Sequence, residues 1–421
     1  MTVRNYTVKH GLYKSLPEGT IYNSQAMALI FMCGAIFKIT AAPGMFAEYC
    51  GSSTLWVCLM LSFFEVVLTT AIFAFARKAG DHFLSAISCR TYRILCAVAA
   101  VWMTLKGAFY FSYSATYLMR ELFAGLEPSI IYIIFLIPIV YIGIKGIRTI
   151  ARSCELSFLI FFGIIMLNLV FLKTDLDFGR NLPVFSIPPK DLFATMPRFG
   201  LWLGDLLPFV FVRIKNKRMP YIVTGLTVTW VLVDIIIMLG AAIYGESLKT
   251  VYNLLINLAG FNQLSLEIGR LDWTNLLCML AMSIYSLSFT YWGVISACKR
   301  AFKNGILGTL LYPLALALTV FAVPSNIMIT DFAIGNFGYV MFALAIGLPL
   351  VLVITLAVQK KRFPKLYRNF DNEYLPYPQE SASTPNSLAD GIMVGFKTEA
   401  IQTQTVTPSG MLQPDNSEDQ Q

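Results

Sequence analysis

Charge is scarce in this chain. Only 13% of its 421 residues are charged, whereas a soluble domain has roughly a quarter of its residues charged. Hydrophobic residues make up 57% of the sequence. This composition excludes an ordinary soluble enzyme and indicates an integral membrane protein whose surroundings are a lipid bilayer.

The residues of catalytic and metal chemistry are also few. The 2 histidines, His10 and His82, lie outside the apolar stretches, and the 8 cysteines form no Cys-x-x-Cys pair. Since there is also no Walker loop and no nucleophile elbow, a membrane hydrolase or a zinc protease is not expected. We predict no catalytic residues, no metal and no cofactor, and we interpret the cysteines as small apolar residues.

Long apolar stretches are what the chain has in plenty. A membrane-spanning helix needs about 20 apolar residues, and ten stretches qualify: 24–49, 53–77, 92–118, 128–146, 155–172, 192–213, 219–243, 271–297, 305–323 and 336–358. We therefore predict an all-α membrane protein with ten transmembrane helices in one domain, residues 24–358. A tail of residues 1–23 precedes it, and a tail of residues 359–421, predicted to be disordered, follows it.

Basic residues gather in alternate connections between the apolar stretches. Clusters follow the second, fourth, sixth, eighth and tenth stretches. Cytoplasmic loops of membrane proteins are enriched in Lys and Arg, so both termini are predicted to be cytoplasmic. The same bias accounts for most of the net charge of +8, and nucleic acid is not an expected partner.

The first and sixth stretches carry the same defect. Thr40 and Asp205 are N-cap residue types, and each stands three residues before a proline, Pro43 or Pro208. We predict that each stretch is two half-helices with a break inside the membrane. Breaks in the first and sixth of ten spans indicate two five-helix halves related as an inverted repeat, with a transporter-like binding site near the bilayer midplane.

Five charged residues lie near the middles of apolar stretches: Lys38, Glu65, Lys106, Asp205 and Asp234. Such charges are costly and face the interior of the bundle. Lys38 either holds a ligand carboxylate or pairs with an acid, and Asp205 is a cap, a ligand-binding group or both. Glu65 and Asp234 are either proton carriers or partners of the lysines.

Local patterns add further candidates. Tyr110, Tyr113 and Tyr117 follow Lys106 at helical spacing and share a face, which is either a cavity wall or a hydrogen-bonded interior face. The spacing of Gly200 and Gly204 indicates close helix packing or unwinding. Unwound backbone in a membrane is tolerated only where it faces a cavity, and its free N–H and C=O groups could bind an amino acid. We interpret three tryptophans as interfacial anchors: Trp56, Trp230 and Trp273.

Several strings in this sequence resemble one family. They are Gly146-Ile-Arg-Thr-Ile-Ala-Arg152-Ser-Cys-Glu155, Asn181-Leu-Pro-Val184, Phe199-Gly-Leu-Trp-Leu-Gly-Asp205 and Leu266-Glu-Ile-Gly-Arg-Leu-Asp-Trp273. Their order and spacing are similar to those of the B-subunit permeases of bacterial spore germinant receptors, a branch of the amino acid–polyamine–organocation superfamily. The resemblance covers about residues 24–358.

This resemblance implies a LeuT-like fold with broken helices one and six, in a bacterial cell membrane or the inner spore membrane. It implies A-type and C-type germinant receptor subunits as partners and a small germinant, typically an amino acid, as ligand. By position, the ligand-binding residues are Gly34, Phe37, Lys38, Thr40, Gly200, Trp202, Gly204 and Asp205, to which we add Tyr110 and Tyr113 from the tyrosine face.

The chain departs from the family pattern in the cation at Lys38 and in the long polar tail after Arg368. Two alternatives stay open. One is a proton-coupled amino acid permease that uses Glu65 or Asp234. The other is a membrane scaffold that binds no ligand.

Overall fold

The computed structural model describes residues 20–79, 90–121, 127–172, 176–181, 187–214, 219–260, 271–302, 305–322 and 335–362. All of them belong to one compact unit, Met1–Tyr367, and a second unit, Arg368–Gln421, lies outside the described residues. The predicted boundaries of the two tails therefore stay predictions.

Helices account for nearly all of the described chain. The long ones are α1 (Asn23–Thr40), α3 (Thr54–Ala79), α5 (Arg90–Glu121), α6 (Pro128–Lys145), α7 (Ile147–Val170), α9 (Met219–Tyr244), α12 (Leu271–Phe302), α13 (Gly305–Ala322) and α15 (Asn336–Arg362). Shorter α-helices are α2 (Ala42–Cys50), α8 (Pro189–Thr195) and α10 (Leu254–Ala259). The 3₁₀ segments are η2 (Gly51–Ser53), η4 (Phe178–Asn181), η5 (Met196–Trp202), η6 (Leu207–Phe211) and η7 (Gly245–Thr250).

A very short parallel ladder joins two distant parts of the chain. Strand β1 (Thr20–Ile21) pairs with β2 (Arg213–Ile214). The ladder ties the segment before α1 to the segment after η6, so the entry to the first predicted span lies beside the exit from the sixth. These two strands were not predicted from the sequence.

Six segments of the described chain are long and apolar enough to cross a membrane: Asn23–Thr40, Ala42–Phe73, Arg90–Met119, Ile147–Val170, Pro220–Thr250 and Trp273–Phe302. Three shorter apolar helices are Ser129–Lys145, Gly305–Thr319 and Phe337–Val351. The all-helical membrane character is thus confirmed, while the ten-helix, five-plus-five arrangement stays a prediction.

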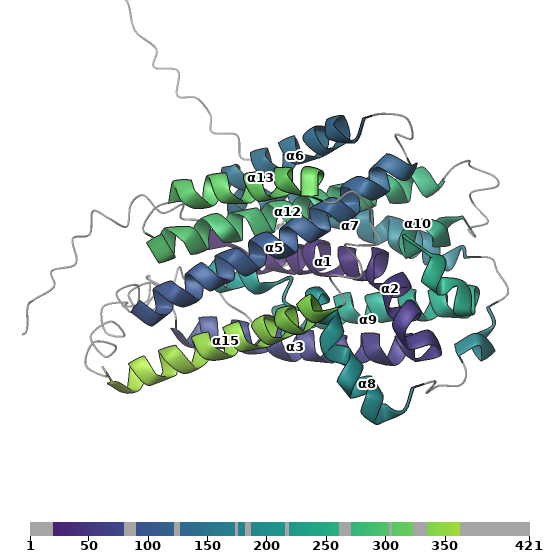
Figure 1. Ribbon diagram of the computed structural model, residues 1–421, viewed down its shortest axis with the longest axis horizontal. Coiled ribbons are helices and arrows are strands. Elements are labelled where there is room, and N and C mark those ends of the chain that lie inside the picture. Colours follow the sequence, from purple (N-terminus) through teal and green to yellow (C-terminus); the bar gives the residue numbers. More distant parts are fainter. Residues whose placement is uncertain are drawn as a thin grey trace, which may run out of the picture. The chain divides into compact units, whose positions relative to one another are not determined.

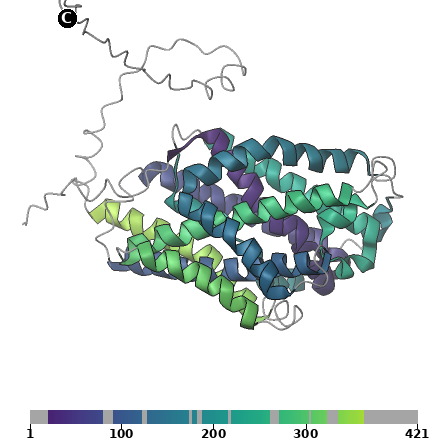
Figure 2. The same cartoon turned by 90° about the horizontal axis from the view of Figure 1, so that it is seen from above.

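Helix α1 forms the centre of the bundle. Nearly all of its residues are buried, and it contacts α7, α9 and α12. The long helices run in the same general direction in both views (Figures 1 and 2). Helix α5 lies next to α12 (Figure 1). Helix α15 packs against η5.

The first predicted break is only a kink. A single residue, Ala41, separates α1 from α2, and it keeps helical dihedral angles of φ −83° and ψ −41°. Thr40 does not cap α2, because its hydroxyl donates to the Ile36 carbonyl at 2.8 Å. The predicted cap is therefore wrong: in a helix a Thr hydroxyl can reach back to the carbonyl of the preceding turn. Pro43 in the first turn of α2 marks the kink.

The second predicted break is a true unwinding. Between η5 and η6 the chain leaves helical geometry, with Leu203 extended (φ −94°, ψ 150°) and Gly204 at φ +79°. Asp205 does not cap η6, since the cap position is Leu206 and no side chain caps it. That part of the prediction is wrong because the Asp205 carboxylate is taken up by two ammonium groups from other helices.

Candidate functional site

Four charged side chains meet inside the bundle at the unwound segment. Lys38 comes from α1, Glu65 from α3, Lys106 from α5 and Asp205 from the link between η5 and η6. Their exposed fractions are 4%, 0%, 3% and 7%, respectively. Burying charged groups is tolerable only when they are paired and hydrogen-bonded, so their pairing decides what the site can do.

We call Lys38, Glu65, Lys106 and Asp205 the charged centre. Asp205 bonds to more side chains than the other three do. Lys38 pairs with its Oδ2 atom, and Lys106 Nζ lies 2.7 Å from its Oδ1 atom. The Tyr110 hydroxyl donates to the same Oδ1 at 3.0 Å. Two ammonium groups and a phenol thus share one carboxylate, and the sequence alternative in which Lys38 pairs with an acid is confirmed.

Glu65 is held differently. Its Oε2 atom accepts the Gly204 backbone N–H at 2.7 Å, so α3 satisfies a donor that the unwinding has freed. Its Oε1 atom is buried and has no hydrogen-bond partner in the described part of the chain. One acceptor in the charged centre is therefore open to a further donor.

Backbone carbonyls near these charged groups also accept hydrogen bonds from side chains. Lys106 Nζ donates to Leu203 O at 2.5 Å, and Lys38 Nζ donates to Gly34 O at 3.0 Å. The Tyr110 hydroxyl lies 3.3 Å from Leu201 O. The lysines thus occupy the polar backbone groups that we predicted would face a ligand.

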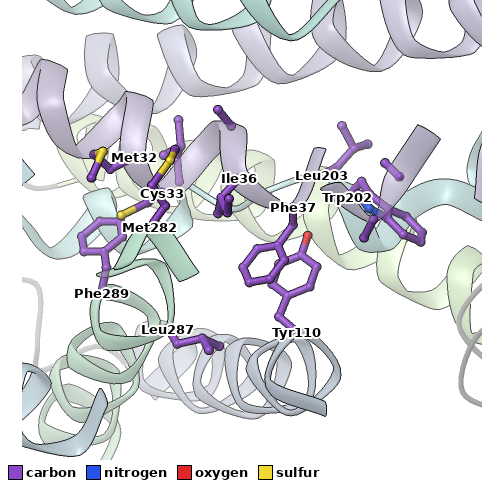
Figure 3. Packing of buried hydrophobic residues seen from close by; sticks show 14 of the residues in the cluster. Met32, Cys33, Ile36, Phe37, Tyr110, Trp202, Leu203, Met282, Leu287 and Phe289 are labelled. Atoms are coloured by element: carbon purple, nitrogen blue, oxygen red, sulfur yellow. The ribbon is translucent and has the colours of Figure 1, made fainter. Parts of the chain in front are cut away.

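Aromatic rings surround the ammonium groups. Phe37 stacks on Tyr110 with ring centroids 3.7 Å apart, and Figure 3 shows the two rings face to face beside the unwound segment. Lys38 Nζ lies 4.5 Å from the Trp230 ring centroid, and Lys106 Nζ lies 5.0 Å from that of Trp102. Cation–π contacts of this kind help to offset the burial of a cation.

Two glycines shape the unwound segment. Gly204 has a positive φ, and a Cβ there would lie 2.7 Å from the Trp102 ring. A Cβ at Gly200 would meet the backbone of Phe342 on α15. The Gly200–Gly204 pattern therefore serves both purposes that the sequence allowed, close packing at the first glycine and unwinding at the second.

The other predicted site residues lie around this centre or away from it. Gly34 faces the Leu206 side chain, and the Trp202 ring contacts Phe46. Tyr113 lies outside the charged centre: its hydroxyl donates to Tyr252 O and its ring stacks on Tyr252.

Asp234 forms a separate polar pair. Its Oδ1 atom accepts the Ser62 hydroxyl at 2.9 Å, and among the described residues it forms no ion pair with Lys38 or Lys106. Ser62 precedes Glu65 by about one turn of α3, so Asp234 on α9 contacts α3 about one turn away from Glu65.

Trp230 was not predicted as part of the site. It is buried on α9 over the Lys38 ammonium, so its interpretation as an interfacial anchor is wrong. One signal was available: Trp230 stands four residues before Asp234, and residues with this spacing share a helix face. Trp102 has the same relation to Lys106 and was also missed.

Residues 20–329 match the family of spore permeases, which is described as spore germination protein. The match covers more than half of the chain and includes the charged centre. No curated protein matches the chain. The resemblance seen in the sequence is confirmed, and this chain belongs to the spore germination permease family.

Proposed function

We propose that this protein is the permease-like subunit of a spore germinant receptor. Its ligand is a small germinant, an amino acid, bound between α1 and the unwound segment after η5. Binding shifts the bundle from one conformation to another, and A-type and C-type subunits respond to that shift. The chain performs no catalysis in this proposal.

The observation that carries the proposal is the charged centre on the unwound segment. An unwound stretch inside a membrane is typical of transporter-like binding sites, and here it meets α1, α3 and α5 through Lys38, Glu65 and Lys106. A zwitterionic amino acid carries a carboxylate and an ammonium group, the same two kinds of group that pair with each other in this centre. Its carboxylate would compete with Asp205 for the lysines, and its ammonium would find the open Oε1 atom of Glu65.

Replacement of an ion pair within the protein by an ion pair with the ligand would also provide the conformational signal. Asp205 now links α1 to α5 through Lys38 and Lys106. A ligand carboxylate that pairs with one lysine would weaken the ion pair of that lysine with Asp205. The ion pair of the other lysine with Asp205 would remain. Since a ligand shifts an equilibrium only by its differential affinity for two states, this exchange supplies the required difference.

A thermal-shift screen of amino acids, nucleosides and sugars on the purified protein tests the proposal. We expect an amino acid to raise the Tm in a saturable manner, because a ligand at about 100 times its Kd stabilises the folded state by roughly 2.7 kcal/mol. If no solute in the screen changes the Tm, the scaffold alternative is favoured instead.

The second candidate is a proton-coupled permease, and the open Oε1 atom of Glu65 favours it. Burying an unpaired negative charge is costly, and a proton taken up by Glu65 would remove that charge. Proton-driven amino acid uptake into vesicles, lost in Glu65→Gln and kept in the wild-type chain, would favour transport. Binding without uptake would favour the receptor.

A further inference from the structure

Basic side chains gather where α6 meets α7. Lys145 is the last residue of α6, and the single residue Gly146 separates it from the start of α7. Arg148 and Arg152 stand four residues apart on α7 and therefore share a face of the helix. Lys145, Arg148 and Arg152 are all exposed, whereas Ile150 between the two arginines is buried. We call these three basic residues the basic corner, and it points away from the bundle.

The basic corner carries an excess of positive charge. Residues 145–155 contain three basic residues and one acid, Glu155. Glu155 accepts the Ser24 hydroxyl at 2.6 Å, and the described chain shows no ion pair of Lys145 or Arg152 with an acid. Lys145 Nζ instead lies 5.2 Å from the ring centroid of Tyr141. An anion from outside the protein would therefore meet cations that no described carboxylate neutralises.

Exposed apolar side chains adjoin the basic corner on both helices. On α6, Ile137 and Tyr141 precede Lys145 in steps of four residues and are 62% and 63% exposed. On α7, Leu156 and Ile160 follow Arg152 in the same steps and are 79% and 59% exposed. Because residues four apart lie on one face of a helix, the exposed face of each helix changes from apolar to cationic near the link. A ligand that matches both parts must be an anion that carries hydrocarbon chains.

We propose that the basic corner binds an anionic phospholipid. The phosphate group pairs with Lys145, Arg148 and Arg152, and the acyl chains lie along the exposed apolar side chains of α6 and α7. The planar guanidinium group of arginine matches the geometry of phosphate, and basic residues beside membrane-spanning helices attract anionic head groups. An acidic protein segment would pair with the cations and leave the apolar faces without a role, so the lipid accounts for both features. This inference is independent of the proposed function, because it involves no residue of the charged centre.

Native mass spectrometry of the purified full-length protein tests the inference, with phosphatidylglycerol and phosphatidylcholine of identical acyl chains added in equal amounts. We expect the protein to retain phosphatidylglycerol in preference to phosphatidylcholine. Arg152→Gln should lower this preference by about fivefold, the contribution of one basic residue at an anionic membrane surface. The triple variant with Lys145→Gln, Arg148→Gln and Arg152→Gln should abolish it.

The matched control is Arg90→Gln. Arg90 is also an exposed arginine on the side predicted to be cytoplasmic, but it lies at the start of α5. Its loss should leave the preference for phosphatidylglycerol unchanged. A second control is glycerol 3-phosphate, which carries the phosphate without acyl chains and should not displace the lipid at equal concentration.

Three results would overturn the inference. Equal losses in Arg152→Gln and Arg90→Gln would mean that anionic lipid is attracted to basic residues in general. Displacement of the lipid by glycerol 3-phosphate would mean that the basic corner binds phosphate without the lipid chains. Equal retention of the two lipids by the wild-type chain would favour an acidic protein partner at the basic corner.

Discussion

At the scale of single residues, Asp205 is shared by two buried ammonium groups. Its Oδ1 atom also accepts the Tyr110 hydroxyl, so three donors depend on one carboxylate. Removing one partner of a buried ion pair leaves an uncompensated charge, which is far more costly than replacing the whole pair by apolar groups. Loss of the Asp205 carboxylate should therefore destabilise the site more than loss of any one of its three donors.

Asp205→Asn should lower the free energy of unfolding by about 3–5 kcal/mol, the usual range when a buried ion pair loses one partner. The matched control is Asp234→Asn, since Asp234 is partly buried and hydrogen-bonds only to Ser62 among the described contacts. The Asp234→Asn variant should lose about 1 kcal/mol of its free energy of unfolding. Thermal unfolding of the purified proteins measures both. Equal Tm values for the two variants would contradict the central role of Asp205 in the charged centre.

Lys106→Met should partly rescue Asp205→Asn. The double variant removes one of the two ammonium groups that Asp205→Asn leaves without a counter-ion, so the two changes should be less than additive, with a coupling of about 1–3 kcal/mol. A double-mutant cycle from unfolding data gives this value. Strict additivity would mean that the ion pair of Lys106 with Asp205 contributes nothing.

At the scale of elements, the two breaks differ in kind. Thr40, which bonds to Ile36 O, lets the helix continue through Ala41, whereas the chain from Leu203 to Leu206 is unwound around the positive φ of Gly204. The unwound segment is stabilised from outside itself. Glu65, Lys106 and Tyr110 satisfy its freed backbone groups from α3 and α5.

Gly204→Ala should destabilise the protein by about 1–3 kcal/mol, the cost of holding a non-glycine residue in a sparsely populated backbone region. The contact of its Cβ with the Trp102 ring adds to this cost. Gly163→Ala on α7 is the control, because a Cβ there meets nothing within 4 Å and alanine favours the helix. Its Tm should be unchanged or higher. A Gly204→Ala protein as stable as the control would show that the segment can adopt helix.

The sequence predicted the location of the breaks better than their geometry. Proline positions and intramembrane charges are local signals, and they identified Lys38, Lys106, Glu65 and Asp205 before any coordinates. The partners were not predictable, because whether Asp205 bonds its own backbone or two lysines depends on how α1 and α5 pack. The contact of Trp230 on α9 with Lys38 on α1 likewise depends on packing, whereas Trp102 lies one turn before Lys106 on α5 and its contact could have been predicted from that spacing.

At the scale of the whole molecule, the charge pattern predicts an orientation. Lys145 lies at the end of the fourth stretch, beside a basic connection predicted to be cytoplasmic, and Lys190 lies in the connection after the next stretch, predicted to be on the opposite side. Both lysines are exposed. The described native cysteines are buried, so they should give little background to a thiol reagent.

Lys190→Cys should react with a membrane-impermeant maleimide added to intact cells, and Lys145→Cys should react only after the membrane is opened. Labelling measured by gel shift compares the two. The reverse pattern would invert the predicted topology, and labelling of both in intact cells would contradict the prediction that the stretch 155–172 between them crosses the membrane.

The most direct test of a ligand site at the charged centre is the affinity of Tyr110→Phe for the solute that gives the largest thermal shift. The control is Tyr291→Phe, which also loses a hydroxyl that bonds a backbone carbonyl, Thr309 O at 2.8 Å, but outside the charged centre. Because Tyr110 donates to Asp205, we predict that its loss changes the Kd by about tenfold, the effect of one hydrogen bond to a charged group. The Tyr291→Phe protein should bind as the wild type does. Identical Kd values in both variants would place the ligand elsewhere and contradict the account.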